Sequence, residues 1–280
     1  MTIQPHLALA LRPIANFIAG HFQTIEYSEH QGQMIHECGQ SMKSHPHYRM
    51  VTSPKLLACR HRYCPFCQHE RVENLQQQVN SFMEIVESSG AKANWLVLIL
   101  YGQQSIVNCL KRRLEEMESA FTQLTRRRFA QHILGCIRFL EVSQDQVDSR
   151  LARPRFRCLL LVTTSMFEGA DCVSEAQWAE RWRNFLNRRT TPEVHLMRLV
   201  GSAHRVTESV QNEIHKSMSY SDDFPSEEWF LEMTRQVQGV PTLNVDGVLK
   251  PWLTKALEDQ EEDLARERRY SIAKSSIQVP

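Results

Sequence analysis

The sequence lacks any hydrophobic run long enough to cross a membrane. Its longest strongly apolar stretch, Trp95–Tyr101, is far shorter than the ~20 residues that a spanning helix needs. The N-terminus also lacks a basic segment followed by a long apolar stretch and a small-residue cleavage site, so we expect no signal peptide. These absences predict a cytoplasmic protein with no membrane partner.

Neither sign of charge is in surplus. Lys+Arg 33 and Asp+Glu 32 give a formal net charge of +1, so a nucleic-acid partner would have to be recognised through local patches. Glycine (10) and proline (11) are sparse and hydrophobic residues make up 42%, which excludes collagen-like, low-complexity and wholly disordered chains. A chain of 280 residues predicts one or two domains, with a core that needs no cross-links.

Eight cysteines are present, and in a reducing compartment they are expected to be thiols or metal ligands. Half of them are scattered in apolar stretches and are most simply small buried hydrophobic residues: Cys109, Cys136, Cys158 and Cys172. The others lie close together in the sequence: Cys38, Cys59, Cys64 and Cys67. The second set is therefore the candidate metal site.

The segment Cys64-Pro-Phe-Cys67 is similar to the tight turn of a zinc knuckle, where two thiolates converge on one tetrahedral ion. We predict a structural Zn²⁺ held by Cys59, Cys64 and Cys67, with Cys38 as the fourth ligand. Buried free thiols or a redox pair are the alternatives for these cysteines. The alternative fourth ligands are His36, His45, His47, His61 and His69.

Hydrophobic periodicity predicts an alternation of helices and strands after residue 70. The expected helices are 70–90, 107–128, one following Ser174, 203–220 and 226–238; the expected strands are 94–101, 136–143, 155–163 and 194–200. This order predicts an α+β fold, with an antiparallel sheet of the split βαβ type, helices on one face and an N-terminal zinc module. Residues 1–35 show no clear pattern.

Several motifs occur in an order that resembles a known family. They are Cys38-Gly, Cys59 with Cys64-Pro-Phe-Cys67 and Arg71, Glu141-Val-Ser143, the strand Arg153-Pro-Arg-Phe-Arg-Cys-Leu-Leu-Leu-Val162, Trp178 with Trp182, Glu213-Ile-His-Lys-Ser217 and Gly247-Val-Leu-Lys250. Across roughly residues 36–255 the chain resembles the rolling-circle replication initiators of small bacterial plasmids, within the HUH endonucleases. The resemblance implies a zinc module within 1–70, an HUH-like domain over 71–250 and a charged helical tail over 251–280.

The resemblance also implies a nuclease site, from which this sequence departs. In the family, two histidines and a carboxylate hold a divalent metal, and a tyrosine attacks the scissile phosphate. The matching positions here are Arg155, Arg157 and Ser217, and only Glu141 is retained. Because arginine has no lone pair to offer a cation, we expect no catalytic metal and no nuclease activity. Both arginines should pair with Glu141 if it shares their sheet face.

We therefore predict a DNA-binding protein in which Arg153, Arg155, Arg157 and Lys216 clamp the phosphates of single-stranded or hairpin DNA. A regulator or a scaffold with a protein partner is the expected role. One alternative is an active initiator with altered nicking chemistry at Ser217 or Tyr220. Others are a protein-interaction module without DNA binding, an RNA-binding surface, or arginines that are simply solvated. We interpret His45-Pro-His47-Tyr48 as a loop or an extra zinc ligand.

Overall fold

The computed structural model describes residues 5–23, 29–39, 58–126, 128–218, 225–262 and 264–265. The chain forms two compact units, of which the smaller comprises Met1–Asn74, Met218–Asp222 and Glu261–Pro280. The larger comprises Leu75–Ser217 and Asp223–Gln260. His45, His47 and Tyr220 lie outside the described residues. The domain boundaries expected at residues 70 and 250 stay predictions.

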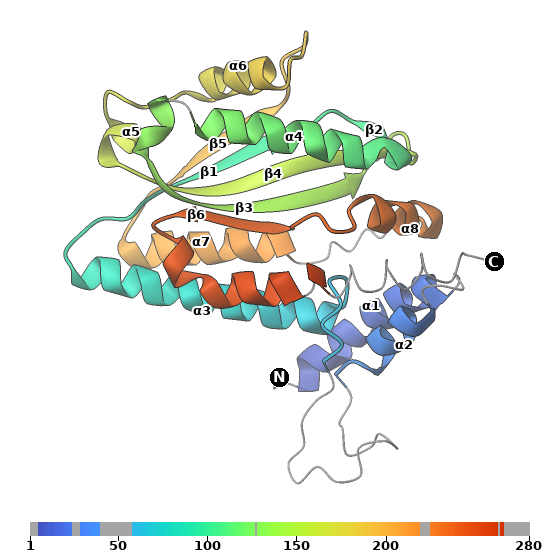
Figure 1. The fold of residues 1–280 in the computed structure, drawn as a ribbon. Helices are drawn as coiled ribbons and strands as arrows, with labels where there is room; N and C mark the ends of the chain where they lie inside the picture. Colours follow the sequence, from blue (N-terminus) through green and yellow to red (C-terminus); the bar gives the residue numbers. More distant parts are fainter. Residues whose placement is uncertain are drawn as a thin grey trace. The chain divides into compact units, whose positions relative to one another are not determined.

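An antiparallel sheet organises the larger unit (Figure 1). Its order is β5-β1-β4-β3-β6, and the short β2 pairs with the start of β4. The strands are β1 (Asn94–Tyr101), β2 (Ser105–Ile106), β3 (Ile133–Gln144), β4 (Leu151–Val162), β5 (Val194–Leu199) and β6 (Leu243–Gly247). The α+β class and the antiparallel sheet are confirmed. The edge strand β6 was not foreseen, because a short strand with polar Asn and Asp carries little hydrophobic signal.

Helices connect the strands close to the predicted positions. They are α3 (Pro65–Ser88), η2 (Val107–Cys109), α4 (Leu110–Thr125), η3 (Arg128–His132), α5 (Thr164–Glu168), α6 (Glu175–Phe185), α7 (Ala203–Met218), α8 (Glu227–Gln236) and η4 (Lys250–Trp252). Ser174 caps α6 through a reciprocal capping box with Gln177. On the buried face of α6, Trp182 donates its indole N–H to the carbonyl oxygen of Tyr101, 2.9 Å away, and so ties α6 to β1.

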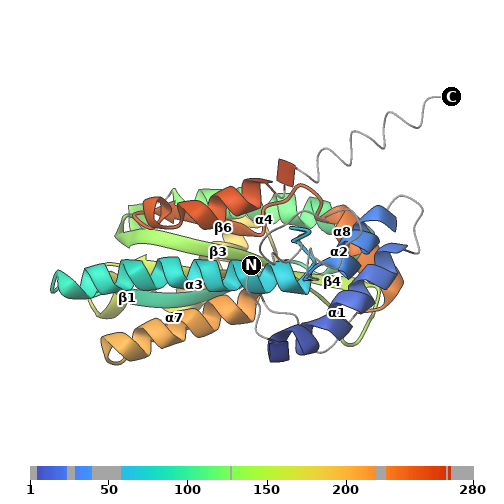
Figure 2. The same cartoon turned by 90° about the horizontal axis from the view of Figure 1, so that it is seen from below.

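Helices cover both faces of the sheet, so the expectation of a single helical face is wrong. Adjacent residues of β4 show this directly, because side chains alternate along a strand. The ring of Phe156 packs edge-on against Phe121 of α4, whereas Arg157 reaches Glu213 of α7 on the opposite face. Figures 1 and 2 show α4 on one side, and α7 beside the end of α3 on the other. β4 also buries apolar side chains on both faces, for example Cys158 on one and Leu159 on the other.

The smaller unit contains two helices that the sequence did not indicate, α1 (Pro5–Gln23) and α2 (Glu29–Glu37). The buried apolar residues of α1 are Ala15, Ile18, Ala19 and Phe22, a stripe at helical spacing. Gly32 of α2 allows the two helices to approach closely, since a Cβ there would lie 2.6 Å from the carbonyl oxygen of Ala19. In the described ranges, no helix combines the length and the apolar character needed to cross a membrane.

Gly247 ends β6 in a conformation that only glycine adopts without strain, and it offers a test of the sheet edge. Its φ is +69°, and an added Cβ would lie 2.2 Å from the carbonyl oxygen of Leu134. We expect Gly247→Ala to lower the free energy of unfolding by about 3 kcal/mol, measured by urea denaturation. Gly90→Ala is the control, because Gly90 has φ +74° but open space around it. Its cost should be about 1 kcal/mol, and equal losses for both variants would contradict this account.

Candidate functional site

The arginines of β4 lie on the sheet face that α7 covers. In the register of the sheet, Arg155 is paired with Tyr101 of β1 on one side and with Glu141 of β3 on the other. Paired residues of an antiparallel sheet point to the same face. The three side chains therefore meet above the middle of the sheet.

Glu141 receives one guanidinium on each carboxylate oxygen. Arg157 donates from Nε to Oε1 over 2.7 Å, and Arg155 donates from Nε to Oε2 over 2.5 Å. The predicted pairing of both arginines with Glu141 is confirmed. Arg155 also donates from Nη1 to the hydroxyl of Tyr101 at 3.2 Å.

A second carboxylate, Glu213 of α7, completes the network. Its oxygens accept a hydrogen bond from Arg157 Nη1 at 2.6 Å and one from Lys216 Nζ at 2.7 Å. The Glu213 side chain is only 4% exposed, because Val206, Val210 and Ile214 turn this face of α7 towards the sheet. The hydroxyl of Ser217 donates to the backbone carbonyl of Glu213 at 3.0 Å.

Arg157 is the centre of this network, since it lies between two carboxylates and is only 11% exposed. Burial by itself lowers the pKa of its guanidinium, but the hydrogen bonds and charges of Glu141 and Glu213 outweigh burial, and the pKa is raised. The pKa of Arg155 is raised in the same way by Glu141. The two carboxylates thus face three basic side chains: Arg155, Arg157 and Lys216.

Arg153 lies nearer the start of β4 than Arg155, and its ion pairs are longer. Its guanidinium is 3.8 Å from Asp145 and 3.6 Å from Glu193, which are loose ion pairs. Glu193 also contacts His195 of β5: His195 Nε2 lies 2.8 Å from Glu193 Oε1. Sequence reasoning missed Tyr101, Glu193 and His195, because their nearness to Arg153 and Arg155 depends on how β1 and β5 pair.

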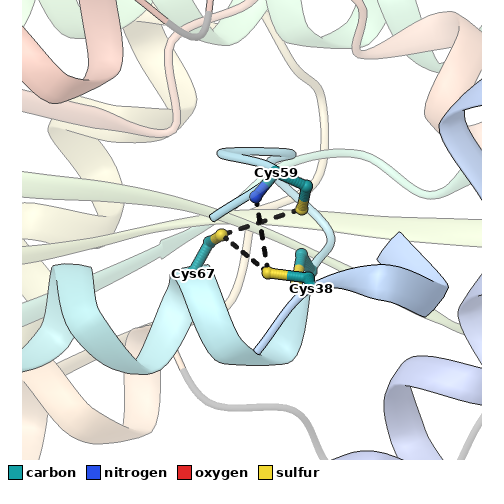
Figure 3. Close-up of side chains that lie close together, drawn as sticks. Cys38, Cys59 and Cys67 are labelled. Atoms are coloured by element: carbon teal, nitrogen blue, oxygen red, sulfur yellow. Dashed lines mark hydrogen bonds between the residues drawn. The ribbon is translucent and has the colours of Figure 1, made fainter. Parts of the chain in front are cut away.

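The four clustered cysteines are brought together in the smaller unit. Figure 3 shows three of them, Cys38, Cys59 and Cys67, with their side chains converging. All are buried, and their sulfur atoms lie within 4.8 Å of one another. The distance from Cys67 Sγ is 3.6 Å to Cys38 Sγ and 3.7 Å to Cys59 Sγ. Four thiolates around a tetrahedral Zn²⁺ at about 2.3 Å would be about 3.8 Å apart, so the spacing fits a structural zinc ion.

Backbone N–H groups point at the same sulfurs. The N–H of Arg60 donates to Cys67 Sγ at 3.2 Å, and that of Cys59 donates to Cys38 Sγ at 3.4 Å. Arg71 of α3 holds this loop by donating to the carbonyl of Arg60 at 2.9 Å. Such N–H groups stabilise negative charge on sulfur, which suits thiolate ligands.

Hydrogen bonds among the thiols shift three of their pKa values in different directions. Hydrogen bonding to Cys38 raises the pKa of Cys59 and of Cys64, and it lowers the pKa of Cys67. Arg71 further favours the Cys67 thiolate. A bound divalent cation would hold the remaining thiols in their thiolate form, and would supply a cross-link between α2, the loop and α3.

Cys38 fits best as the fourth ligand. Within the described residues, the cluster contains Cys38 and none of the histidines His36, His61 or His69. His61 accepts the backbone N–H of Tyr63 on Nδ1 and packs edge-on against Phe22. The remaining alternatives, His45 and His47, lie outside the described residues.

Comparison with known proteins shows the family of the chain. A family model described as "Replication protein" matches residues 51–277, and the chain therefore belongs to the replication protein family. A "Protein rep" from Bacillus amyloliquefaciens is 24% identical over 214 residues. The match covers 73% of this chain and 62% of the length of that relative. A "Protein rep" from Bacillus sp is 24% identical over 212 residues, covering 72% of this chain and 67% of the relative. None of the solved structures compared with the chain matches it.

The cysteine cluster predicts a measurable metal content. We expect the purified chain to contain an equimolar amount of zinc by elemental analysis, and Cys64→Ser to lower that amount, because a buried ligand is lost. Cys109→Ser is the matched control, since Cys109 is an exposed cysteine of the larger unit and should leave the zinc content unchanged. Full zinc retention by Cys64→Ser would contradict the assignment.

The arginine network predicts a large stability effect at one position. Arg157→Ala leaves Glu141 and Glu213 buried without their shared cation, so the free energy of unfolding should fall by about 3–5 kcal/mol. Urea denaturation measures this change. Arg150→Ala is the control: Arg150 pairs with Asp148 but is highly exposed, and its loss should cost below about 1 kcal/mol. Similar losses for both variants would refute a central role for Arg157.

Proposed function

We propose that this chain binds DNA as a nuclease-inactive relative of plasmid replication initiators. The observation that carries the proposal is the position of Arg157 between Glu141 and Glu213. Two carboxylates that face each other could hold a divalent metal between them. Here the guanidinium of Arg157 occupies the space between the two carboxylates. A guanidinium is always protonated and has no lone pair, so these residues do not fit a catalytic metal.

Among the described residues, the arrangement of Ser217 also supports inactivity. Ser217 stands where the related initiators carry their tyrosine, and its hydroxyl is hydrogen-bonded to the helix backbone through the carbonyl of Glu213. A serine needs an adjacent general base to attack a phosphate. The hydrogen bond of Ser217 directs its proton to a carbonyl, which is not a base of that kind.

Phosphate binding is assigned to the cations that reach solvent. The Arg155 side chain is 30% exposed, that of Arg153 38% and that of Lys216 60%. Arg155 Nη2 makes no hydrogen bond within the described part of the chain, so it is available to a phosphate oxygen. Arg157 instead positions Glu141 and Glu213, and through them the exposed cations.

Membership of the replication protein family supports a proposal for the form of DNA and for the biological role. A replication protein that holds single-stranded or hairpin DNA without cutting it would compete with an active initiator, regulate it, or serve as a scaffold for a protein partner. The cysteine cluster would contribute a structural zinc ion. The cytoplasm of a bacterium is the compartment that this role requires.

A gel that separates a mobility shift from cleavage tests the proposal. Purified protein is incubated with a labelled hairpin that carries a single-stranded arm, with and without Mn²⁺. We expect a shift that weakens steeply with salt, and no cleavage in either lane. A cleaved product with protein linked to its 5′ end would show an active initiator with altered chemistry. No shift at any salt concentration would favour a protein-interaction module.

Charge-removing variants locate the binding surface in the same assay. Arg155→Gln should weaken binding roughly tenfold, because a charge-assisted contact is lost. It should also lower the slope of log affinity against log salt by about one. Arg112→Gln is the matched control, since Arg112 is highly exposed on α4, across the sheet from Glu141. Equal weakening by both variants would mean that the surface around Arg155 is not the DNA-binding site.

A further inference from the structure

Two aromatic side chains share the sheet face of the arginine network. Tyr101 of β1 is paired with Arg155, and Ile99 of β1 is paired both with Arg157 of β4 and with His195 of β5. Paired residues point to one face, so Tyr101 and His195 lie on the same side of the sheet as Arg155 and Arg157. Their ring centroids are 5.8 Å apart, and the rings are perpendicular, at 88°.

These rings stand directly beside the exposed cation. The Tyr101 hydroxyl accepts a hydrogen bond from Arg155, whose Cζ lies 5.7 Å from the centroid of the tyrosine ring. The His195 side chain is 53% exposed. One small area of surface therefore combines a positive charge, the exposed ring of His195 and the half-buried ring of Tyr101.

Glu193 fixes the orientation of this area. One of its oxygens lies 2.8 Å from His195 Nε2, and the other lies 3.6 Å from Arg153 Nη2. The contact of Nε2 with Glu193 thus restrains the His195 ring while the ring packs against Tyr101. An ordered ring binds a flat ligand at lower entropic cost than a free one.

We propose that Tyr101 and His195 form a stacking subsite for an unpaired nucleobase, whose phosphate is held by Arg155. The inference rests on the proposed DNA binding and names its preferred ligand: unpaired nucleotides rather than duplex. A base within a duplex has both of its faces covered by neighbouring bases, whereas an unpaired base offers a free face to an aromatic side chain. Stacking accepts any base, and so the subsite recognises single-strandedness rather than sequence.

The test measures binding of the full chain to a fluorescent hairpin with a single-stranded arm, by anisotropy. Tyr101→Ala should weaken binding about tenfold, the usual effect of losing one base–aromatic stack. The salt slope should not change, because no charge is removed. Tyr101→Phe keeps the ring and loses only the hydroxyl, and its affinity should stay within about threefold of the original protein.

An arm of abasic nucleotides separates stacking from support of Arg155. It keeps every phosphate and lacks every base, so the original protein should bind it about tenfold more weakly than the normal arm. Tyr101→Ala should then show no further loss on the abasic arm, since the missing ring and the missing base are the same contact. A further tenfold loss on the abasic arm would mean that Tyr101 only positions Arg155, and would overturn the subsite.

Two more comparisons complete the test. His195→Ala should weaken binding to the normal arm severalfold, whereas His204→Ala should not, because His204 is an exposed histidine about 20 Å along α7 from Ser217. A blunt hairpin without an arm should bind more weakly than the armed hairpin. If the armed and the blunt hairpins bind equally and the Tyr101 variants have no effect, the subsite is wrong and DNA binding stands. If no DNA binds the original protein, the proposed function itself fails.

Discussion

The buried contact of Arg157 with two carboxylates is the constraint on which the rest of the site depends. It connects three elements at one point: β4 carries the arginine, β3 supplies Glu141 and α7 supplies Glu213. Burying these charges costs free energy that only good geometry and complete pairing offset. The direct hydrogen bonds of 2.6 and 2.7 Å meet that requirement, and they fix α7 against the sheet at this position.

The same contact determines which charges remain at the surface. Each carboxylate has two oxygens, and Arg157 occupies one oxygen of each. The second oxygen of Glu141 takes Arg155 and the second oxygen of Glu213 takes Lys216, and both of these cations extend towards solvent. The buried charges are therefore balanced internally, and the surplus of positive charge is displayed where a phosphate can reach it. A metal ion held by these carboxylates would have to displace a permanent cation from each of them.

The sequence allowed the pairing of Arg155 and Arg157 with Glu141 to be predicted only on the condition that Glu141 shares their face. Alternation along β4 places the two arginines together, but the register of β3 against β4 decides the face of Glu141. Cys38 could likewise be proposed as a zinc ligand from composition and nearness to Cys59. Glu213 lay within a recognised motif, but its contact with Arg157 depends on the packing of α7, which periodicity does not determine. Tyr101 and His195 required the register of β1 with both neighbours. These long-range features are set by tertiary packing and leave little trace in local pattern.

A formal net charge of +1 limits how this chain can bind DNA. In the proposed DNA binding, attraction would arise from a few exposed cations, because the chain has no strong overall field, and Glu193 and Asp145 would partly offset Arg153. Salt screens such contacts within about 10 Å at 0.1 M. In the proposed subsite, stacking is a contact between a base and an aromatic ring, so salt should weaken it far less than it weakens the phosphate contacts. The preference for unpaired over paired nucleotides should therefore persist at salt concentrations where total affinity falls, and selectivity then rests on the rings more than on the arginines.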